Sequence, residues 1–133
     1  NFKMPREQMT ARIIKALNNK YVDIYAHPTA RQINFREPID FDKKRVFKFC
    51  AKKGIILEVD AHPMRLDLNF TDVKDALETG CKIAINTDAH DLNQLNHMRF
   101  GIATARRGWA EAKDVVNTKS ANELKKFFTK LRD

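Results

Sequence analysis

Three of the four histidines in this 133-residue chain stand in similar surroundings. They are His27 in Ala-His-Pro-Thr, His62 in Asp-Ala-His-Pro and His90 in Thr-Asp-Ala-His. Asp60 and Asp88 each precede a histidine by two positions, and residues so spaced lie on the same side of an extended chain. Converging carboxylate and imidazole groups would suit Zn²⁺, Mn²⁺ or Fe²⁺, and the absence of Cys from these stretches argues against a structural thiolate zinc site.

Each stretch follows an apolar, β-rich run, and these runs predict strands over 21–26, 55–59 and 81–86. The strands start about thirty residues apart and a helical pattern follows each one, which is typical of βαβ units in a parallel sheet. In α/β folds the working residues lie where strands end. Because adjacent strands are about 4.8 Å apart, we expect side chains from neighbouring strand ends to meet there.

Helices are expected wherever apolar residues recur at helical spacing. The expected segments are 5–18, 42–53, 71–80, 92–106 and a last helix that begins near residue 120, with Leu131 on its apolar face. Thr71 is the expected N-cap of the third helix, Gly54 ends the second, and Ser120 forms a capping box with Glu123. The chain has no linker or low-complexity tract, so we expect one α/β domain with few strands.

The composition is that of a basic globular protein. Hydrophobic residues make up 43% and charged residues 32%, and 25 Lys and Arg against 17 Asp and Glu give a net charge of +8. This charge favours polyanionic partners or phosphorylated substrates. Two cysteines, Cys50 and Cys81, cannot build a disulfide framework, so we expect buried thiols and a cytoplasmic protein. The sequence contains no Walker loop, dinucleotide-binding Gly motif or nucleophile elbow.

The candidate ligands also have structural alternatives. A His-Pro pair such as that at His27 is common in turns. Asp88 and His90 could cap the following helix, a role that Asp91 could also fill. Asp60 could hydrogen-bond backbone, and the nearby histidine could simply lie in a solvated loop.

The basic residues near these stretches point to phosphate. Arg31 and Arg65 each follow a His-Pro pair by a few residues, so both would lie around the same opening at the strand ends. Their guanidinium groups could hold phosphate through paired hydrogen bonds. The alternative is a salt bridge, for example between Arg65 and Asp67. Trp109 and Phe100 are more typical of a core than of a base-stacking surface.

Taken in order along the chain, several motifs resemble one known family. The strings are YAHPTAR (25–31), EVDAHPMRLDL (58–68), INTDAH (85–90), MRFGIATARRGW (98–109) and DVVNT (114–118). They are similar to the polymerase-and-histidinol-phosphatase (PHP) domain of bacterial and archaeal family X DNA polymerases. The resemblance implies a distorted, TIM-like (βα)₇ barrel with a metal cluster at the strand ends. It also implies metal-dependent phosphoester hydrolysis, typically a 3′-to-5′ exonuclease or 3′-end processing activity on DNA.

The resemblance assigns roles to individual positions. His27, Asp88 and His90 match metal ligands, and Asp88 and His90 would belong to the catalytic centre. Arg31 and Arg65 match basic residues near the opening, where they would contact phosphate or DNA. Three more positions would be additional ligands or would support the ligands from behind; they are Glu58, Asp60 and His62, the last often Asn in the family. The implied cofactors are divalent metals, Mn²⁺ or Zn²⁺.

The family's opening His-x-His motif and first barrel strands would precede Asn1, so residues 1–133 resemble a single partial PHP domain from the C-terminal portion of the barrel. The expected partners are DNA, the rest of the barrel and the polymerase domains, with self-association through an open sheet edge and no membrane. We expect this portion alone to be weak or inactive. One alternative is a basic, metal-free nucleic-acid-binding or scaffold module, and another is a phosphatase that acts on a small phosphomonoester.

Overall fold

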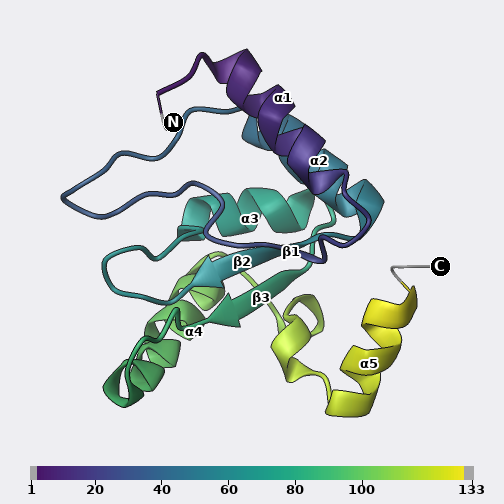
Figure 1. The fold of residues 1–133 in the computed structure, drawn as a ribbon. Coiled ribbons are helices and arrows are strands. Elements are labelled where there is room, and N and C mark those ends of the chain that lie inside the picture. The colour runs from purple at the N-terminus through teal and green to yellow at the C-terminus, as the bar shows by residue number, and fades with distance from the viewer. Residues whose placement is uncertain (1–2, 131–133) are drawn as a thin grey trace.

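The computed structural model describes residues 3–130 and contains a three-stranded parallel sheet. The strands are β1 (Ile24–Tyr25), β2 (Ile56–Asp60) and β3 (Ile83–Asn86), in the order β1-β2-β3. Ile24 pairs with Ile56, and Leu57 pairs with Ile83. The arrowheads of β2 and β3 point the same way in Figure 1. The predicted α/β fold with parallel strands is confirmed, whereas the described strands do not close into a barrel.

Helices and short 3₁₀ segments alternate with the strands. The α-helices are α1 (Arg6–Leu17), α2 (Lys43–Lys53), α3 (Phe70–Glu78), α4 (Met98–Arg107) and α5 (Ala121–Lys130). The 3₁₀ segments are η1 (Leu92–His97), η2 (Ala112–Asp114) and η3 (Val116–Thr118). No helix among residues 3–130 has the length and apolar character that a bilayer span requires.

Local sequence signals set several helix ends as predicted. Gly54 ends α2 with a left-handed φ of 72°, a conformation open to glycine because it has no Cβ. Ser120 and Glu123 form the expected capping box, since the Ser120 N–H donates to Glu123 Oε2 over 2.8 Å and the Glu123 N–H donates to Ser120 Oγ over 3.3 Å. Leu131, expected on the apolar face of this helix, lies outside the described residues.

Other predicted boundaries are wrong. The first strand covers two residues rather than 21–26, because the Asn19 side chain and carbonyl accept the N–H groups of Tyr21 and Val22 and fold that segment into a turn. Asn69, not Thr71, caps α3, and its side chain accepts the Asp72 N–H over 2.9 Å.

The helix predicted over 92–106 is also divided, because its first part is the 3₁₀ segment η1. The Asp91 side chain caps η1 by accepting the N–H groups of Asn93 and Gln94. The alternative role foreseen for Asp91 is therefore confirmed.

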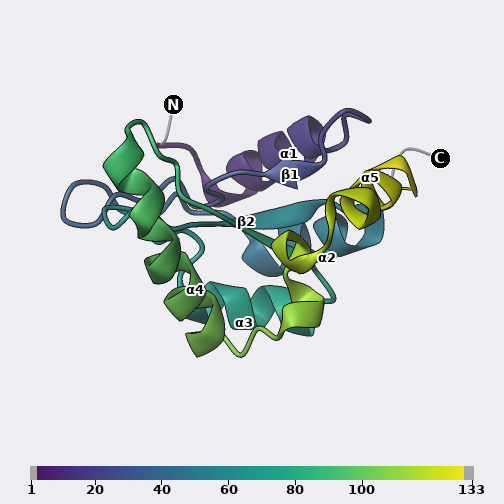
Figure 2. The ribbon, with the colours of Figure 1, turned by 90° about the horizontal axis from the view of Figure 1, so that it is seen from below.

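The two faces of the sheet pack against different helices. Leu57, Val59, Ile83 and Ile85 belong to the main core with α1, α2, α3 and α4. Ile56 and Ala84 face the opposite side, where they contact Val116 and α5. Figure 1 shows α1, α2 and α3 above the strands and α5 below them, and Figure 2 shows α3 and α4 side by side. Since side chains alternate along a strand, Glu58 and Asp60 point to the same face as Ile56.

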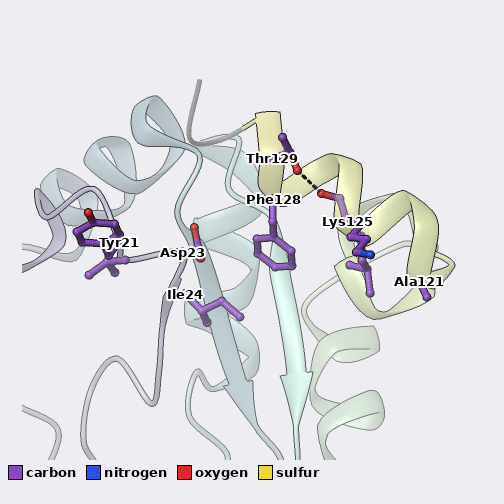
Figure 3. A pocket seen from close by; sticks show the side chains of 9 residues that line it. Tyr21, Asp23, Ile24, Ala121, Lys125, Phe128 and Thr129 are labelled. Atoms are coloured by element: carbon purple, nitrogen blue, oxygen red, sulfur yellow. Dashed lines mark hydrogen bonds between the residues drawn. The ribbon is translucent and has the colours of Figure 1, made fainter.

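The two edge strands of the sheet have different neighbours. At β3, Val115 forms a bridge with Ile83, and the Asn117 side chain binds both backbone groups of Ile85 over 2.7 and 2.9 Å. Beside β1 there is an open groove of about 1000 Å³ that α5 also lines. Figure 3 shows Phe128 pointing toward the segment with Asp23 and Ile24. Among the described residues β1 has a strand partner only on the β2 side, and self-association through this edge remains a prediction.

Candidate active site

The loops that leave the strands gather toward the tips of the arrows in Figure 1, and we call this side of the sheet the opening. A pocket of about 370 Å³ lies there, and we call it the mouth pocket. It is lined by Gln32, Phe35, His62, Met64, Arg65 and His90. Of the residues predicted from sequence, the structure thus brings Arg65, His62 and His90 together, whereas His27 is exposed and does not line this pocket.

Arg65 lies between two carboxylates at the ends of β2 and β3. Its Nε is 3.4 Å from Asp60 Oδ2 and 3.4 Å from Asp88 Oδ2. The alternative of a salt bridge between Arg65 and Asp67 is wrong, because Asp67 is buried elsewhere and accepts hydrogen bonds from Thr29. One guanidinium therefore supplies the positive charge that two neighbouring carboxylates share.

Asp60 is fully buried, and its two oxygens have different surroundings. Oδ1 accepts the His62 N–H over 2.8 Å, so the backbone bond expected as an alternative role is present. Oδ2 accepts no hydrogen bond from the described residues. Burial raises the pKa of Asp60 to about 6, and the nearby Asp88 and Glu58 carboxylates add to this rise while the His62 N–H and Arg65 oppose it. The end of β2 therefore holds an incompletely compensated buried carboxyl group.

Glu58 connects the three strands through both of its oxygens. Oε2 accepts the His27 N–H over 2.5 Å, and Oε1 accepts Asn86 Nδ2 over 2.7 Å. The side chain is buried, and these bonds fix the end of β1 against the end of β3. This arrangement is that of a supporting residue behind the opening, and a ligand role for Glu58 stays a prediction.

Two of the predicted ligands have unusual backbone conformations. His27 has a φ of 30° and Asp88 a φ of 51°, in the left-handed region that residues with a Cβ rarely adopt. Such conformations cost about 1–3 kcal/mol each and gather at functional sites. The strain after β1 and after β3, on the two sides of β2, marks this opening as a place where geometry is maintained at the expense of stability.

The two histidines of the mouth pocket are held as opposite tautomers. His90 Nδ1 lies 2.6 Å from the carbonyl oxygen of Asp88, so this nitrogen carries the hydrogen and Nε2 keeps a lone pair. His62 Nδ1 accepts the Met64 N–H over 3.2 Å, so in the neutral ring Nε2 carries the hydrogen. In their neutral forms one ring can therefore accept a proton at Nε2, and the other can donate a hydrogen bond from Nε2. The His62 ring also packs edge-on against His97, with the ring centroids 5.1 Å apart.

Arg31, a predicted phosphate contact, is occupied by the neighbouring loop. Its Nε donates to the carbonyl oxygen of Arg65 over 2.6 Å, and Nη2 donates to the carbonyl oxygen of Leu66 over 2.6 Å. These bonds hold the chain segment that carries Arg65. Arg31 is thus placed to position Arg65, and its own contact with phosphate stays a prediction.

The donor types at the opening suit a divalent metal, but their arrangement does not. Within residues 3–130 no three His, Cys, Asp or Glu side chains lie close enough together to hold a metal ion. Where Asp60 and Asp88 approach each other, the cation between them is Arg65. His27, Asp88 and His90 therefore do not form a metal site by themselves in this arrangement. Their assignment as ligands, together with Mn²⁺ or Zn²⁺ as cofactor, stays a prediction.

The sequence interpretation also missed the roles or positions of three residues. Asp67 is fully buried and accepts the N–H and hydroxyl of Thr29, a role that its place between two leucines could have indicated. Phe35 lines the mouth pocket although no pattern singled it out. Trp109 was expected in the core and is 79% exposed, because the chain turns away after α4 with a φ of 66° at this residue.

Comparison with known proteins identifies a relative whose name states its activities. The chain is 39% identical over 127 residues to the DNA polymerase/3′-5′ exonuclease PolX of Bacillus subtilis strain 168. The match covers 96% of this chain and 22% of the relative, so the chain spans about a fifth of that protein's length. No family model matches the chain. The resemblance to the PHP-bearing region of family X DNA polymerases, inferred from the motifs, is confirmed by this match.

Proposed function

We propose that this chain forms part of a phosphoesterase that acts on DNA ends, removing nucleotides in the 3′-to-5′ direction or processing 3′ termini. The observation that carries the proposal is the mouth pocket, where Arg65 meets His62 and His90 at the strand ends. The name of the Bacillus relative, which includes a 3′-5′ exonuclease, supports the reaction class. The net charge of +8 would attract a polyanion such as DNA.

Arg65 is the proposed phosphate-binding residue. A guanidinium has five N–H donors, and Asp60 and Asp88 lie near Nε, which leaves the terminal nitrogens for a ligand. The two carboxylates fix the orientation of the side chain, and Arg31 fixes the backbone beneath it. A phosphate held this way would bind through paired, charge-assisted hydrogen bonds.

The opposite tautomers of the two histidines suggest how protons move. His90 Nε2, with its lone pair, is the proposed acceptor of a proton from an attacking water. His62 Nε2, with its hydrogen, is the proposed hydrogen-bond donor to a phosphate oxygen. Both rings line the pocket that Arg65 also lines, as a general base and a hydrogen-bond donor must if they act on one phosphate. Hydrolysis by this route forms a bond between phosphorus and the water oxygen and breaks the P–O bond to the leaving nucleotide, and the proton accepted by His90 passes to the departing oxygen.

The proposed activity of the longer protein is metal-dependent, as the family resemblance implies. Bound divalent metals would activate water and neutralise phosphate charge. Because no three donors gather within the described part of the chain, we assign no metal-bound step to its residues. A metal at Asp60 and Asp88 would require Arg65 to move away or donors from another part of the longer protein to approach.

Binding of single-stranded DNA tests the phosphate role directly. We expect Arg65→Gln to weaken binding of a ten-nucleotide oligomer by about tenfold and to reduce the salt dependence by about one counterion. Arg106→Gln is the matched control, since it removes the same charge from an exposed position in the last turn of α4. Equal losses in both variants would show that only net charge matters and would contradict a phosphate site at Arg65.

Hydrolysis assays separate the proposal from its alternatives. With a 5′-labelled oligonucleotide and Mn²⁺, we expect slow shortening that is lost in His90→Ala and Asp88→Asn. Shortening that persists in both variants would exclude this active site. Salt-sensitive DNA binding that ignores both Mn²⁺ and Asp88→Asn would favour the metal-free binding module. Hydrolysis of p-nitrophenyl phosphate, with the oligonucleotide left intact, would favour a phosphatase for small phosphomonoesters.

A further inference from the structure

Phe35 is a large apolar side chain left in water at the edge of the mouth pocket. It is 77% exposed, and it lines the same pocket as Arg65, His62 and His90. A single exposed aromatic residue is ordinary on a protein surface. Its position beside a guanidinium and two imidazoles is what gives it significance, because a nucleotide joins an apolar ring face to a charged phosphate.

The turn that carries Phe35 is firmly held. Gln32 and Arg36 exchange two backbone hydrogen bonds of 2.9 and 2.8 Å, and the Phe35 N–H donates to the Gln32 carbonyl over 2.9 Å. Asn34 at the tip has a φ of 66°, a conformation that Asn tolerates better than most residues. The ring is therefore presented by a defined turn rather than by a loose loop.

This turn is also tied to the loop that carries Arg65. The Ile33 N–H donates to the Met64 carbonyl over 2.7 Å, one residue before Arg65. Arg36 Nε donates to the Ala30 carbonyl over 2.7 Å, which fastens the turn to the loop that follows β1. Phe35 and Arg65 thus lie on two segments that a main-chain hydrogen bond connects. The backbones that carry the two side chains are therefore held together in the absence of a ligand, which lowers the entropic cost of binding both parts of one molecule.

We propose that Phe35 is a stacking surface for an unpaired nucleobase of the DNA strand whose phosphate Arg65 binds. The inference rests on the proposed function and specifies its substrate as a single-stranded or frayed end. Base–aromatic stacking requires the face of a base to be free, which an internal base of a duplex does not offer. The pocket of about 370 Å³ falls within the range of small-molecule sites. Stacking tolerates every base, so little sequence preference is expected.

The test compares two single-stranded decanucleotides that differ only in the 3′-terminal residue, which is either thymidine or an abasic sugar. Anisotropy of a 5′ label measures the affinity of each. For the unaltered chain we expect about tenfold tighter binding of the oligomer with the terminal base. Phe35→Ala should reduce this preference to near one, and Phe35→Trp should retain it. The control is Trp109→Ala, which removes an equally exposed aromatic ring that does not line the mouth pocket and should retain the preference.

The outcomes separate this inference from the proposed function. If Phe35→Ala keeps the preference, or if the unaltered chain has none, while Arg65→Gln still weakens both oligomers, Phe35 is not a stacking surface and the phosphate site stands. If neither oligomer binds, both proposals fail. If Phe35→Ala leaves the binding of both oligomers unchanged and alters only the association of this chain with another protein segment, the ring is a protein contact and the inference is overturned. A circular dichroism melt confirms that each variant is folded.

Discussion

The loops that follow β1 and β2 begin with the same three residues and have very different electrostatic environments. The first reads Ala-His-Pro-Thr-Ala-Arg over 26–31, and the second reads Ala-His-Pro-Met-Arg over 61–65. Each ends in an arginine, and each lies against two carboxylates. The two loops therefore show how similar sequences at adjacent strand ends come to serve different purposes.

In the first loop the buried carboxylates accept hydrogen bonds from neutral donors, and the arginine donates to backbone carbonyls. Glu58 accepts the His27 N–H, and Asp67 accepts the N–H and hydroxyl of Thr29 over 2.9–3.2 Å. Arg31 donates to two carbonyl oxygens of the opposite loop. Burial raises the pKa of Asp67, and the Thr29 hydrogen bonds oppose that rise. This loop is built as a scaffold.

In the second loop charge is left partly uncompensated. Arg65 faces two carboxylates, each at 3.4 Å, and Asp60 Oδ2 has no hydrogen bond within the described part of the chain. A buried polar atom without a partner usually indicates strain or a functional role. The comparison indicates that the first loop is a rigid scaffold. In the second loop Arg65 is shared between two carboxylates, and a ligand that binds Arg65 can change this ion pairing.

The largest effect should come from breaking the scaffold loop. Asp67→Ala removes the acceptor of the buried Thr29 N–H and hydroxyl, and we expect the free energy of unfolding to fall by about 4 kcal/mol. Asp67→Asn keeps one acceptor oxygen and should cost about half as much. Urea titration monitored by circular dichroism measures both, with the exposed Asp75→Ala as a control expected to change stability by less than about 0.5 kcal/mol. A loss of under 1 kcal/mol for Asp67→Ala would mean that the first loop is not a scaffold.

The next effect concerns the second loop and depends on pH. Because burial raises the pKa of Asp60 from an ordinary 3.8 to about 6 in the fold, the native state holds this proton more tightly than the unfolded chain does. Asp60 therefore stabilises the fold when protonated, and that stability is lost as the pH rises from about 4 to about 6. Each pKa unit corresponds to about 1.4 kcal/mol, so the total loss is about 3 kcal/mol.

Asp60→Asn isolates this effect, since the amide copies the neutral carboxyl and can still accept the His62 N–H. We expect the variant to match the unaltered chain near pH 4 and to be more stable by up to about 3 kcal/mol at pH 7.5. Unfolding titrations at a series of pH values measure the difference. A variant that is less stable at pH 7.5 would show that Arg65 compensates the charged carboxylate fully, and the proposed contrast between the loops would disappear.

The sequence determined the elements better than the contacts between them. Gly54, Asp91 and the Ser120–Glu123 pair act on neighbouring backbone, so their roles can be read from local patterns. The strand before His27 was overestimated because Asn19 captures the donors of the next residues. Such competition between a turn and a strand depends on small energy differences that residue types alone do not resolve.

The candidate site shows the same division. The gathering of polar residues at strand ends follows from the βαβ pattern and was predicted. The partners of Arg65 were not predicted. Asp60, Asp67 and Asp88 are all candidates, and only the path of the loop decides which of them pair with Arg65. Asp67 turns away to Thr29, a residue 38 positions distant. The exposed position of Phe35 likewise depends on a turn held by long-range bonds.

A smaller effect should follow from loosening the bond between the loops. Arg31→Gln shortens the side chain that donates to the carbonyl oxygens of residues 65 and 66, and we expect a stability loss of about 2 kcal/mol. Affinity for the single-stranded oligomer should fall by about threefold, less than in Arg65→Gln, because Arg31 acts by positioning. Urea titration measures the loss of stability, and anisotropy measures the loss of affinity. An affinity loss larger than that of Arg65→Gln, with stability unchanged, would instead make Arg31 the phosphate contact.

The smallest effect tests whether Arg65 takes the place of a metal cation. Arg65→Gln leaves Asp60 and Asp88 without a positive neighbour, so we expect Mn²⁺ to bind about fivefold more tightly than to the unaltered chain, a gain of about 1 kcal/mol. Electron paramagnetic resonance of free Mn²⁺ measures the affinity at pH 7.5, and Asp60→Asn combined with Arg65→Gln should remove the gain. The control Arg106→Gln changes the net charge equally and should leave Mn²⁺ affinity nearly unchanged. If Arg65→Gln and Arg106→Gln raise the Mn²⁺ affinity equally, the effect comes from overall charge. The carboxylates at the ends of β2 and β3 then do not face a common cation position. A gain confined to Arg65→Gln would mean that the second loop differs from the first because its arginine occupies a cation position that a divalent metal can also use.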